Sequence, residues 1–232
     1  MSMEVDMNVK EAHRHTHSLS NTSKMPGKSY GIQAKFCGIG AKLAKVKGTV
    51  CSSCYGMNGF YHMPTTIKAE DIRMDLMLND PLWEDGMVVK IERLKEPWFR
   101  WFDNGDLQSI YNLERIIRVC ERTPRINHWL PTKEYGIVNE WLDNGGLVPT
   151  NLVIRPSGYK MNGTPPVFRG KFTKMAELPT STATRLDEDG EPINPSGSVC
   201  PAHWQDGQCR DCRKCWNKEV QNVTYIDQLQ KV

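Results

Sequence analysis

The chain has 232 residues and a formal net charge of +3 at pH 7, and 39% of its residues are hydrophobic and 25% charged. This length favours one domain with a proper core, and the nearly balanced charge gives no strong signal for nucleic-acid binding. No stretch approaches the roughly 20 apolar residues of a membrane span. The eight cysteines, with no apolar run near the start that would suggest a secretion signal, indicate free thiols in a reducing compartment.

The first part of the chain is polar, and the sequence predicts a flexible N-terminal tail over residues 1–24. A turn then opens a single predicted α/β cluster-binding domain over residues 25–232. Its first element is a strand-like run over 29–36.

Three cysteines, Cys37, Cys51 and Cys54, follow this run, and we call them the head cysteines. A Cys-x-x-Cys pair can turn two thiolates toward one metal or iron–sulfur cluster. Three thiolates leave one metal position open, which is where a substrate or water binds in catalytic metal sites. The sequence therefore predicts a reactive cluster here.

The middle of the chain alternates helical and strand patterns. Helices are predicted over 69–78, 83–95, 110–120 and 135–142, and strands over 98–103, 126–130 and 147–154. Such alternation is typical of parallel strands joined by helices. We therefore expect an α/β fold that resembles part of a TIM barrel, a partial (β/α) barrel, with Cys120 and His128 in its core.

Polar residues follow three of these predicted strands. In parallel sheets, ligands bind beyond the carboxyl ends of the strands, so we expect a cleft that binds a small-molecule substrate of unknown identity. The candidate catalytic residues are Asp103, Asp106, Lys133 and Arg155, and the candidate cofactor-binding residues are Asn104, Gly105 and Ser109.

Each candidate also has a structural interpretation. Asp106 or Ser109 could cap the following helix, Lys133 could point into solvent, and Arg155 could pair with an aspartate. Asp103 is the first choice for catalysis, because a carboxylate directly after the apolar run WFRWF has little structural reason to be there.

Beyond residue 160 the pattern weakens. One more strand is expected over 167–175, then a polar loop over 179–198, and a helix or strand with a tail over 218–232. Between them lie four cysteines, which we call the tail cysteines: Cys200, Cys209, Cys212 and Cys215.

The tail cysteines can fill all four positions of one closed site. Their C-x2-C-x2-C run is similar to the compact runs of ferredoxins, which favours a 4Fe-4S cluster. Zinc is the alternative at these residues, because Cys-x-x-Cys alone does not separate the two. The head and tail cysteines could also combine into a single four-thiolate site with ligands from both ends of the chain.

The chain resembles the phage protein family called gene product eighty-eight. The matching stretches are 24–27 (KMPG), Cys37, 48–61 (GTVCSSCYGMNGFY), 99–109 (FRWFDNGDLQS), 127–133 (NHWLPTK) and 199–216 (VCPAHWQDGQCRDCRKCW). The resemblance implies a bacteriophage protein that works in the cytoplasm of the infected bacterial host.

A more distant resemblance is to radical S-adenosylmethionine enzymes. In those enzymes three cysteines after the first strand hold a 4Fe-4S cluster with one open iron, and a polar glycine-containing turn after the second strand binds the methionine amino group. The head cysteines and Asn104-Gly105-Asp106 would fill these two roles here. The chain departs from that pattern, since thirteen residues separate Cys37 from Cys51.

Three functions follow as hypotheses. The first is an iron–sulfur enzyme that binds S-adenosylmethionine at the open iron. The second is a metal- or cluster-dependent hydrolase, with Asp103 or Asp106 as general base. The third is a non-enzymatic phage–host interaction module in which both cysteine sets hold structural zinc or clusters.

Overall fold

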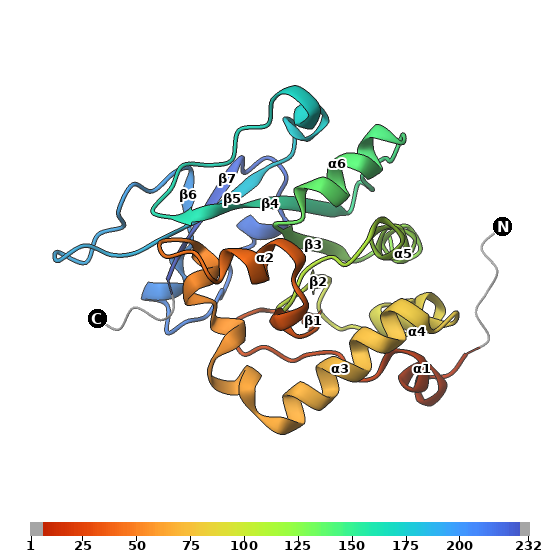
Figure 1. Ribbon diagram of the computed structural model, residues 1–232. Coiled ribbons are helices and arrows are strands. Elements are labelled where there is room, and N and C mark those ends of the chain that lie inside the picture. The colour runs from red at the N-terminus through yellow and green to blue at the C-terminus, as the bar shows by residue number, and fades with distance from the viewer. Residues whose placement is uncertain (1–6, 228–232) are drawn as a thin grey trace.

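One sheet of seven parallel strands forms the centre of the protein (Figure 1). The computed structural model describes residues 7–227. The strands are β1 (Lys28–Tyr30), β2 (Trp98–Trp101), β3 (Asn127–Thr132), β4 (Leu152–Met161), β5 (Thr180–Thr184), β6 (Ser198–Val199) and β7 (Asn222–Ile226). Their order in the sheet is β1-β2-β3-β4-β5-β7-β6. The predicted α/β fold with parallel strands is confirmed, and the sheet is open, with β1 and β6 at its edges.

Six α-helices belong to the described part of the chain. They are α1 (Val9–Thr16), α2 (Gly38–Leu43), α3 (Pro64–Asn79), α4 (Trp83–Ile91), α5 (Ile110–Glu121) and α6 (Tyr135–Asp143). Helices α2 to α6 lie in the connections from β1 to β4. Seven short 3-10 turns complete the framework: η1 (Ala34–Phe36), η2 (Val50–Ser53), η3 (Tyr55–Met57), η4 (Gly59–His62), η5 (Gly170–Met175), η6 (Pro201–Trp204) and η7 (Lys214–Trp216).

The two faces of the sheet are covered by different material. Because side chains alternate along a strand, Phe99 and Trp101 point into the core beneath the helices. Trp98 points to the other face, where it packs on Trp216 of the segment over residues 200–220, which we call the tail-cysteine segment. His128 is buried on the helix side, where it stacks on Trp101. Cys120 belongs to the same core, so both predicted core residues are confirmed.

The segment predicted as a flexible tail over residues 1–24 contains helix α1 in the part that the structure describes, and residues 1–6 lie outside that part. Helix α1 begins with a capping box, in which Asn8 accepts from the backbone N–H groups of Lys10 and Glu11 while Glu11 accepts from that of Asn8. The helix packs on α4 because Gly86 leaves room, where a Cβ would lie 2.7 Å from Thr16. Short helices of this kind are stabilised by tertiary packing rather than by intrinsic helix propensity.

The C-terminal part also differs from the prediction. The strand expected over 167–175 is instead the 3-10 turn η5, and the polar loop expected over 179–198 contains β5. Strand β5 reads Thr-Ser-Thr-Ala-Thr and carries no apolar alternation. Its buried hydroxyls are satisfied by the next strand, since Thr182 bonds Thr224 across β7 at 2.9 Å. A polar strand of this kind is stable only when its partner supplies those hydrogen bonds.

Candidate functional site

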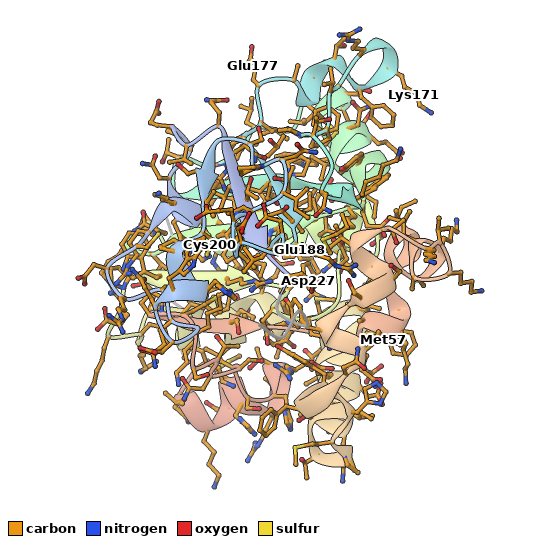
Figure 2. All side chains as sticks on the ribbon, turned by 90° about the vertical axis from the view of Figure 1, so that its left-hand side faces the viewer. Met57, Lys171, Glu177, Glu188, Cys200 and Asp227 are labelled. Atoms are coloured by element: carbon orange, nitrogen blue, oxygen red, sulfur yellow. The ribbon has the colours of Figure 1, made fainter. Side chains whose placement is uncertain are left out.

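A single cavity at the carboxyl end of the sheet brings the two cysteine sets together. All three head cysteines line it, and so do three of the four tail cysteines, Cys200, Cys209 and Cys215. Strand-end residues form the rest of the wall, and two of the lining residues, Cys200 and Asp227, are labelled in Figure 2. The placement agrees with the rule that ligands bind at the carboxyl ends of parallel strands.

The head cysteines come from the connection after β1. Cys37 directly precedes α2, Cys51 lies in η2, and Cys54 follows it. The Thr49 hydroxyl fixes η2 by accepting from the backbone N–H of Ser52 at 3.2 Å. A Cβ on Gly40 would lie 3.5 Å from the Cys37 Sγ and 3.7 Å from the Cys51 Sγ. Glycine at this position therefore keeps open the space beside two of the three sulfurs.

Two of the head thiols, those of Cys37 and Cys51, are buried enough to resist ionisation. Burial raises the pKa of Cys37, and the nearby Asp106, Cys54 and Cys51 raise it further. Burial also raises the pKa of Cys51, while Lys133 opposes that shift. A thiolate needs a compensating positive charge in such surroundings, and a metal ion supplies one.

The tail cysteines are fixed by backbone hydrogen bonds. The Cys200 N–H donates to the Thr224 carbonyl, and the Cys209 N–H donates to the Lys24 carbonyl, both at 2.8 Å. The Cys215 sulfur lies 3.3 Å from the Tyr225 hydroxyl. Burial raises the pKa of Cys209 and raises that of Cys215 to about 12. Cys212 alone of the set lies outside the cavity wall.

Arg155 holds the tail-cysteine segment against the sheet. Its buried guanidinium donates to five backbone carbonyls, at distances of 2.7 to 3.1 Å. The acceptors are the carbonyls of Thr180, Lys214, Cys215, Asn217 and Val220. Arg155 does not line the cavity, so its contacts support a structural role instead of the predicted catalytic one.

Asp103 belongs to the cavity wall and has one carboxylate oxygen without a hydrogen-bond partner. The residue is 2% exposed and lines the cavity wall. Its Oδ2 accepts from the Tyr61 hydroxyl at 3.2 Å, whereas its Oδ1 is buried with no hydrogen-bond partner in the described chain. A buried carboxylate oxygen without a partner is costly, and a ligand that donates a hydrogen bond would satisfy it.

Asp106 and Lys133 are joined at the ends of β2 and β3. Asp106 Oδ1 accepts from the Thr132 hydroxyl at 2.6 Å and from the Leu107 N–H at 2.8 Å, and Oδ2 accepts from the Lys133 N–H at 2.7 Å. Burial nevertheless raises the pKa of Asp106 to about 6. Both residues line the cavity. Asp106 therefore ties two strand ends together rather than capping α5.

Only two of the three predicted cofactor-binding residues lie at the cavity. Asn104 and Gly105 line the cavity, and Gly105 has a φ of 83° with no space for a Cβ against Ile32. The Asn104 amide donates to the Glu70 carboxylate at 3.0 and 3.1 Å. Ser109 instead caps α5 by accepting from the Asn112 N–H at 3.1 Å, which is its structural interpretation.

Sequence reasoning missed Arg100 on the cavity wall. Its guanidinium carbon lies 4.5 Å from the centre of the Trp129 ring, and it donates to the Tyr55 hydroxyl at 3.0 Å. Its Nε is buried without a partner in the described chain. The run WFRWF contained a signal for this position. Side chains alternate between the two faces of a strand, so Arg100 lies on the face opposite to its core neighbours Phe99 and Trp101.

Fold and site together define an α/β protein with a cysteine-lined cavity at the carboxyl end of a parallel sheet. The family model described as Gene product 88 matches residues 6–218, so the chain belongs to this family. A comparison with curated proteins returns no match, and a comparison with solved structures returns none either. None of these comparisons supports the more distant resemblance to radical S-adenosylmethionine enzymes.

Two further findings concern the described residues alone. Within residues 7–227, no group of three or more histidine, cysteine, aspartate or glutamate side chains meets the geometry of a site for one metal ion. The same residues contain no helix that is long and apolar enough to cross a membrane.

Proposed function

We propose that this protein is an enzyme with a 4Fe-4S cluster held by the head cysteines, and that its substrate binds in the adjoining cavity. The observation that carries this proposal is the shared cavity wall, to which both the head cysteines and Asp103, with its unpartnered Oδ1, belong. Three thiolates leave one iron without a protein ligand. The cavity is where an added ligand would reach it.

The head cysteines suit such a cluster for two reasons. Gly40 leaves space beside the Cys37 and Cys51 sulfurs that any side chain would fill. A cubane holds its thiolates farther apart than one zinc ion does, so it needs such space. The second reason is electrostatic, since the partly buried thiols of Cys37 and Cys51, whose pKa values are raised, become thiolates readily only beside positive iron.

The tail cysteines form the second proposed site, which holds another 4Fe-4S cluster or a zinc ion. Four cysteines with two Cys-x-x-Cys steps provide a complete set of ligands. The five carbonyl contacts of Arg155 to the sheet and to residues 214–220 support a structural role for this site. Because both sets line one cavity, a single site with ligands from both ends is the rival arrangement.

S-adenosylmethionine is the ligand that we propose for the open iron. If the head cysteines hold a 4Fe-4S cluster, its reduced form would supply the one electron that reductive cleavage of this sulfonium needs. The chain contributes hydrogen-bonding groups, and Asp103 Oδ1 is an acceptor for the ligand's ammonium group. Arg100 Nε is a donor for a carboxylate, because it too lacks a partner in the described chain. Asn104 and Gly105 shape the wall between β1 and β2.

A hydrolase is the second candidate. In this version Asp103 is the general base, because its free Oδ1 can accept a proton from water. Asp106 is less suited to that role, since both of its oxygens already accept hydrogen bonds. The head metal would then act as a Lewis acid.

Host cytoplasm is the proposed place of action, as the phage resemblance implies. All eight cysteines are free, and a reducing compartment keeps them available for metal.

Ligand assignment is tested by iron and sulfide analysis of anaerobically purified protein. We expect Cys37→Ala to lose the head cluster and Cys209→Ala to lose the tail metal, each without the other. Cys120→Ala is the matched control, because Cys120 is a core residue outside the cavity. Loss of all metal in both Cys37→Ala and Cys209→Ala would indicate one shared site.

Chemistry is tested by adding S-adenosylmethionine and dithionite to the anaerobic protein and measuring 5′-deoxyadenosine. We expect product from the unsubstituted protein and far less from Asp103→Asn, which keeps the shape but not the charge. Hydrolysis of model phosphoesters without any 5′-deoxyadenosine would favour the second candidate.

A further inference from the structure

Two neighbouring strands place buried N–H donors in residues of the cavity wall. Arg100 of β2 and Trp129 of β3 are register partners, so their side chains project to the same face of the sheet. Both residues line the cavity. Arg100 Nε and Trp129 Nε1 are buried, and neither has a hydrogen-bond partner in the described chain. Such donors need an acceptor, because a buried N–H group without one is costly.

Direct contacts hold these two side chains together. The guanidinium carbon of Arg100 lies 4.5 Å from the centre of the Trp129 ring, and Arg100 Nη2 donates to the Tyr55 hydroxyl at 3.0 Å. Trp129 is 5% exposed, and its ring packs edge-on against Trp216 with 5.3 Å between the ring centres. The two donors therefore belong to one packed unit on the face of the sheet that the tail-cysteine segment covers.

The charge of Arg100 favours an anion as the missing partner. Within residues 7–227 its guanidinium forms no ion pair. Its contacts there are the Tyr55 hydroxyl, the Met25 sulfur and the Trp129 ring. A water molecule would satisfy the N–H groups but would leave the charge without a counter-ion. An anionic ligand satisfies both the N–H groups and the charge.

The wall next to these donors is apolar. Met25 and Tyr225 line the same cavity. The Met25 sulfur lies 4.0 Å from Arg100 Nη1, and the centre of the Tyr225 ring lies 6.2 Å from that of Trp129. Met25, Trp129 and Tyr225 pack in one hydrophobic cluster. A ligand whose anionic end meets Arg100 and Trp129 would therefore place an apolar body against Met25 and Tyr225.

We propose that Arg100 and Trp129 form a carboxylate-binding subsite, and that the substrate of this cavity is a carboxylic acid with an apolar body. This inference deepens the proposed function and rests on it, because it names the substrate class of the same cavity. One guanidinium balances the single charge of a carboxylate but not the nearly double charge of a phosphate monoester. The Arg100 Nε–H and the indole N–H are the donors for the carboxylate oxygens.

Two molecules can bring a carboxylate to these donors. One is S-adenosylmethionine, to which Arg100 Nε was assigned above, and the other is the substrate. The surroundings favour the substrate, because S-adenosylmethionine carries an ammonium group and a sulfonium near its carboxylate, whereas Met25, Trp129 and Tyr225 present an apolar wall. In this arrangement Asp103 remains the acceptor for the ammonium group of S-adenosylmethionine.

Calorimetric titration of the anaerobically purified protein tests the subsite without any turnover. The probe is benzoate, and benzamide is its neutral counterpart. Trp129→Phe removes the indole N–H but keeps an aromatic ring between Arg100 and Tyr225, and Arg100→Gln removes the charge. Trp204→Phe is the matched control, because Trp204 is 55% exposed and does not line the cavity.

We expect benzoate to bind at least about tenfold more tightly than benzamide, since a hydrogen bond to a charged group contributes that much or more. Trp129→Phe should weaken benzoate binding by roughly tenfold, and Arg100→Gln by about thirtyfold or more. Trp204→Phe should bind benzoate like the original protein. In protein labelled with ¹⁵N, the indole N–H resonance that Trp129→Phe lacks should shift when benzoate is added, which a purely structural role of Trp129 would not cause.

Three results would overturn the inference. The first is equal affinity for benzoate and benzamide, or no binding of either, because the subsite would then not recognise a carboxylate. The second is displacement of benzoate by a lower concentration of inorganic phosphate. The third is displacement of benzoate by S-adenosylmethionine, which would return the two donors to that ligand.

These results are distinct from failure of the proposed function. A protein without iron that still binds benzoate through Arg100 and Trp129 would sink the cluster enzyme but leave the carboxylate subsite. Iron and 5′-deoxyadenosine formation without benzoate binding would leave the enzyme and sink the subsite.

Discussion

Glu70 is a buried carboxyl group that titrates near neutral pH. It is 1% exposed, and burial raises its pKa to about 7, although the hydrogen bond from Asn104 opposes the shift. The unfolded chain ionises Glu70 above pH 4.5 while the folded protein still holds the proton. Its contribution to stability is therefore complete below pH 4.5 and is lost as pH rises through 7, by about 1.4 kcal/mol per pH unit.

Replacing Glu70 with Gln removes this titration but keeps an acceptor for Asn104. We expect Glu70→Gln to match the original protein at pH 5 and to be more stable at pH 8. Thermal unfolding at both values measures the difference. A stability gap that does not change between pH 5 and pH 8 would show that Glu70 is ionised in the folded state.

His128 gives the opposite pH dependence. Burial lowers its pKa to about 3, and its Nε2 lies 2.8 Å from the Thr123 hydroxyl. Below pH 6.5 the unfolded state takes up a proton that the folded state excludes, so His128 reduces stability as pH falls toward 3. We expect His128→Gln to be less stable at pH 7, through poorer packing, and to lose less stability than the original protein by pH 4.5. Parallel loss in both proteins, measured by urea unfolding, would contradict this.

The placement of a single residue could be predicted where a local sequence rule determines it. Asp103 was singled out because it directly follows a buried strand, and within residues 7–227 its Oδ1 is the only carboxylate oxygen that is itself fully buried without a hydrogen-bond partner. The contacts of Arg155 could not be predicted, since its five carbonyl partners come from segments 25 to 65 residues away in the chain. No local pattern carries that information.

At the scale of elements, Arg155 links β4 to the tail-cysteine segment. We expect Arg155→Met to lower stability by roughly 3–5 kcal/mol, because five buried carbonyls lose their donors. The same change should release the tail metal while the head cluster stays. Arg155→Lys should rescue only partly, since one ammonium cannot reach all five acceptors. Retention of both metals in Arg155→Met, measured by iron and zinc analysis, would show that the segment is held by other contacts.

Gly27, next to β1, and Gly136, in α6, form a matched pair of sites for substitution by alanine. A Cβ on Gly27 would collide with the Trp98 carbonyl, whereas a Cβ on Gly136 in α6 meets nothing within 4 Å. We expect Gly27→Ala to destabilise by about 1–3 kcal/mol, as overpacking does, by pushing β1 away from β2. Gly136→Ala should stabilise by up to about 1 kcal/mol through helix propensity. Similar midpoints for both variants in urea unfolding would contradict the register of β1 on β2.

Apolar elements were predicted better than polar ones. Helix α5 and strand β2 carry clear apolar periodicity, so both were located. Strand β5 was predicted as a loop, and the region of β7 was left open between helix and strand, because their interior is lined by hydroxyl and amide groups, such as Thr182 and Asn222, which bond each other at 3.0 Å. A run of polar residues predicts a loop as long as the partner strand that satisfies its hydrogen bonds is not known.

At the scale of the whole molecule, the sheet order explains how the two ends of the chain meet. The head cysteines follow β1 at one edge, and the tail cysteines lie between β6 and β7 near the other. Both sets still line one cavity. Spacing along the sequence predicted two sets of ligands but left open whether they meet, because their common cavity depends on the pairing of β7 between β5 and β6.

The central claim is an open iron of the head cluster that faces the cavity. The most direct measurement is the electron paramagnetic resonance spectrum of the anaerobic, reduced protein before and after addition of S-adenosylmethionine. We expect a cluster signal that shifts when the ligand is added, a shift that Cys37→Ala abolishes and Cys120→Ala retains. Colourless protein that contains zinc but no iron, or a cluster signal that no added ligand changes, would contradict the account.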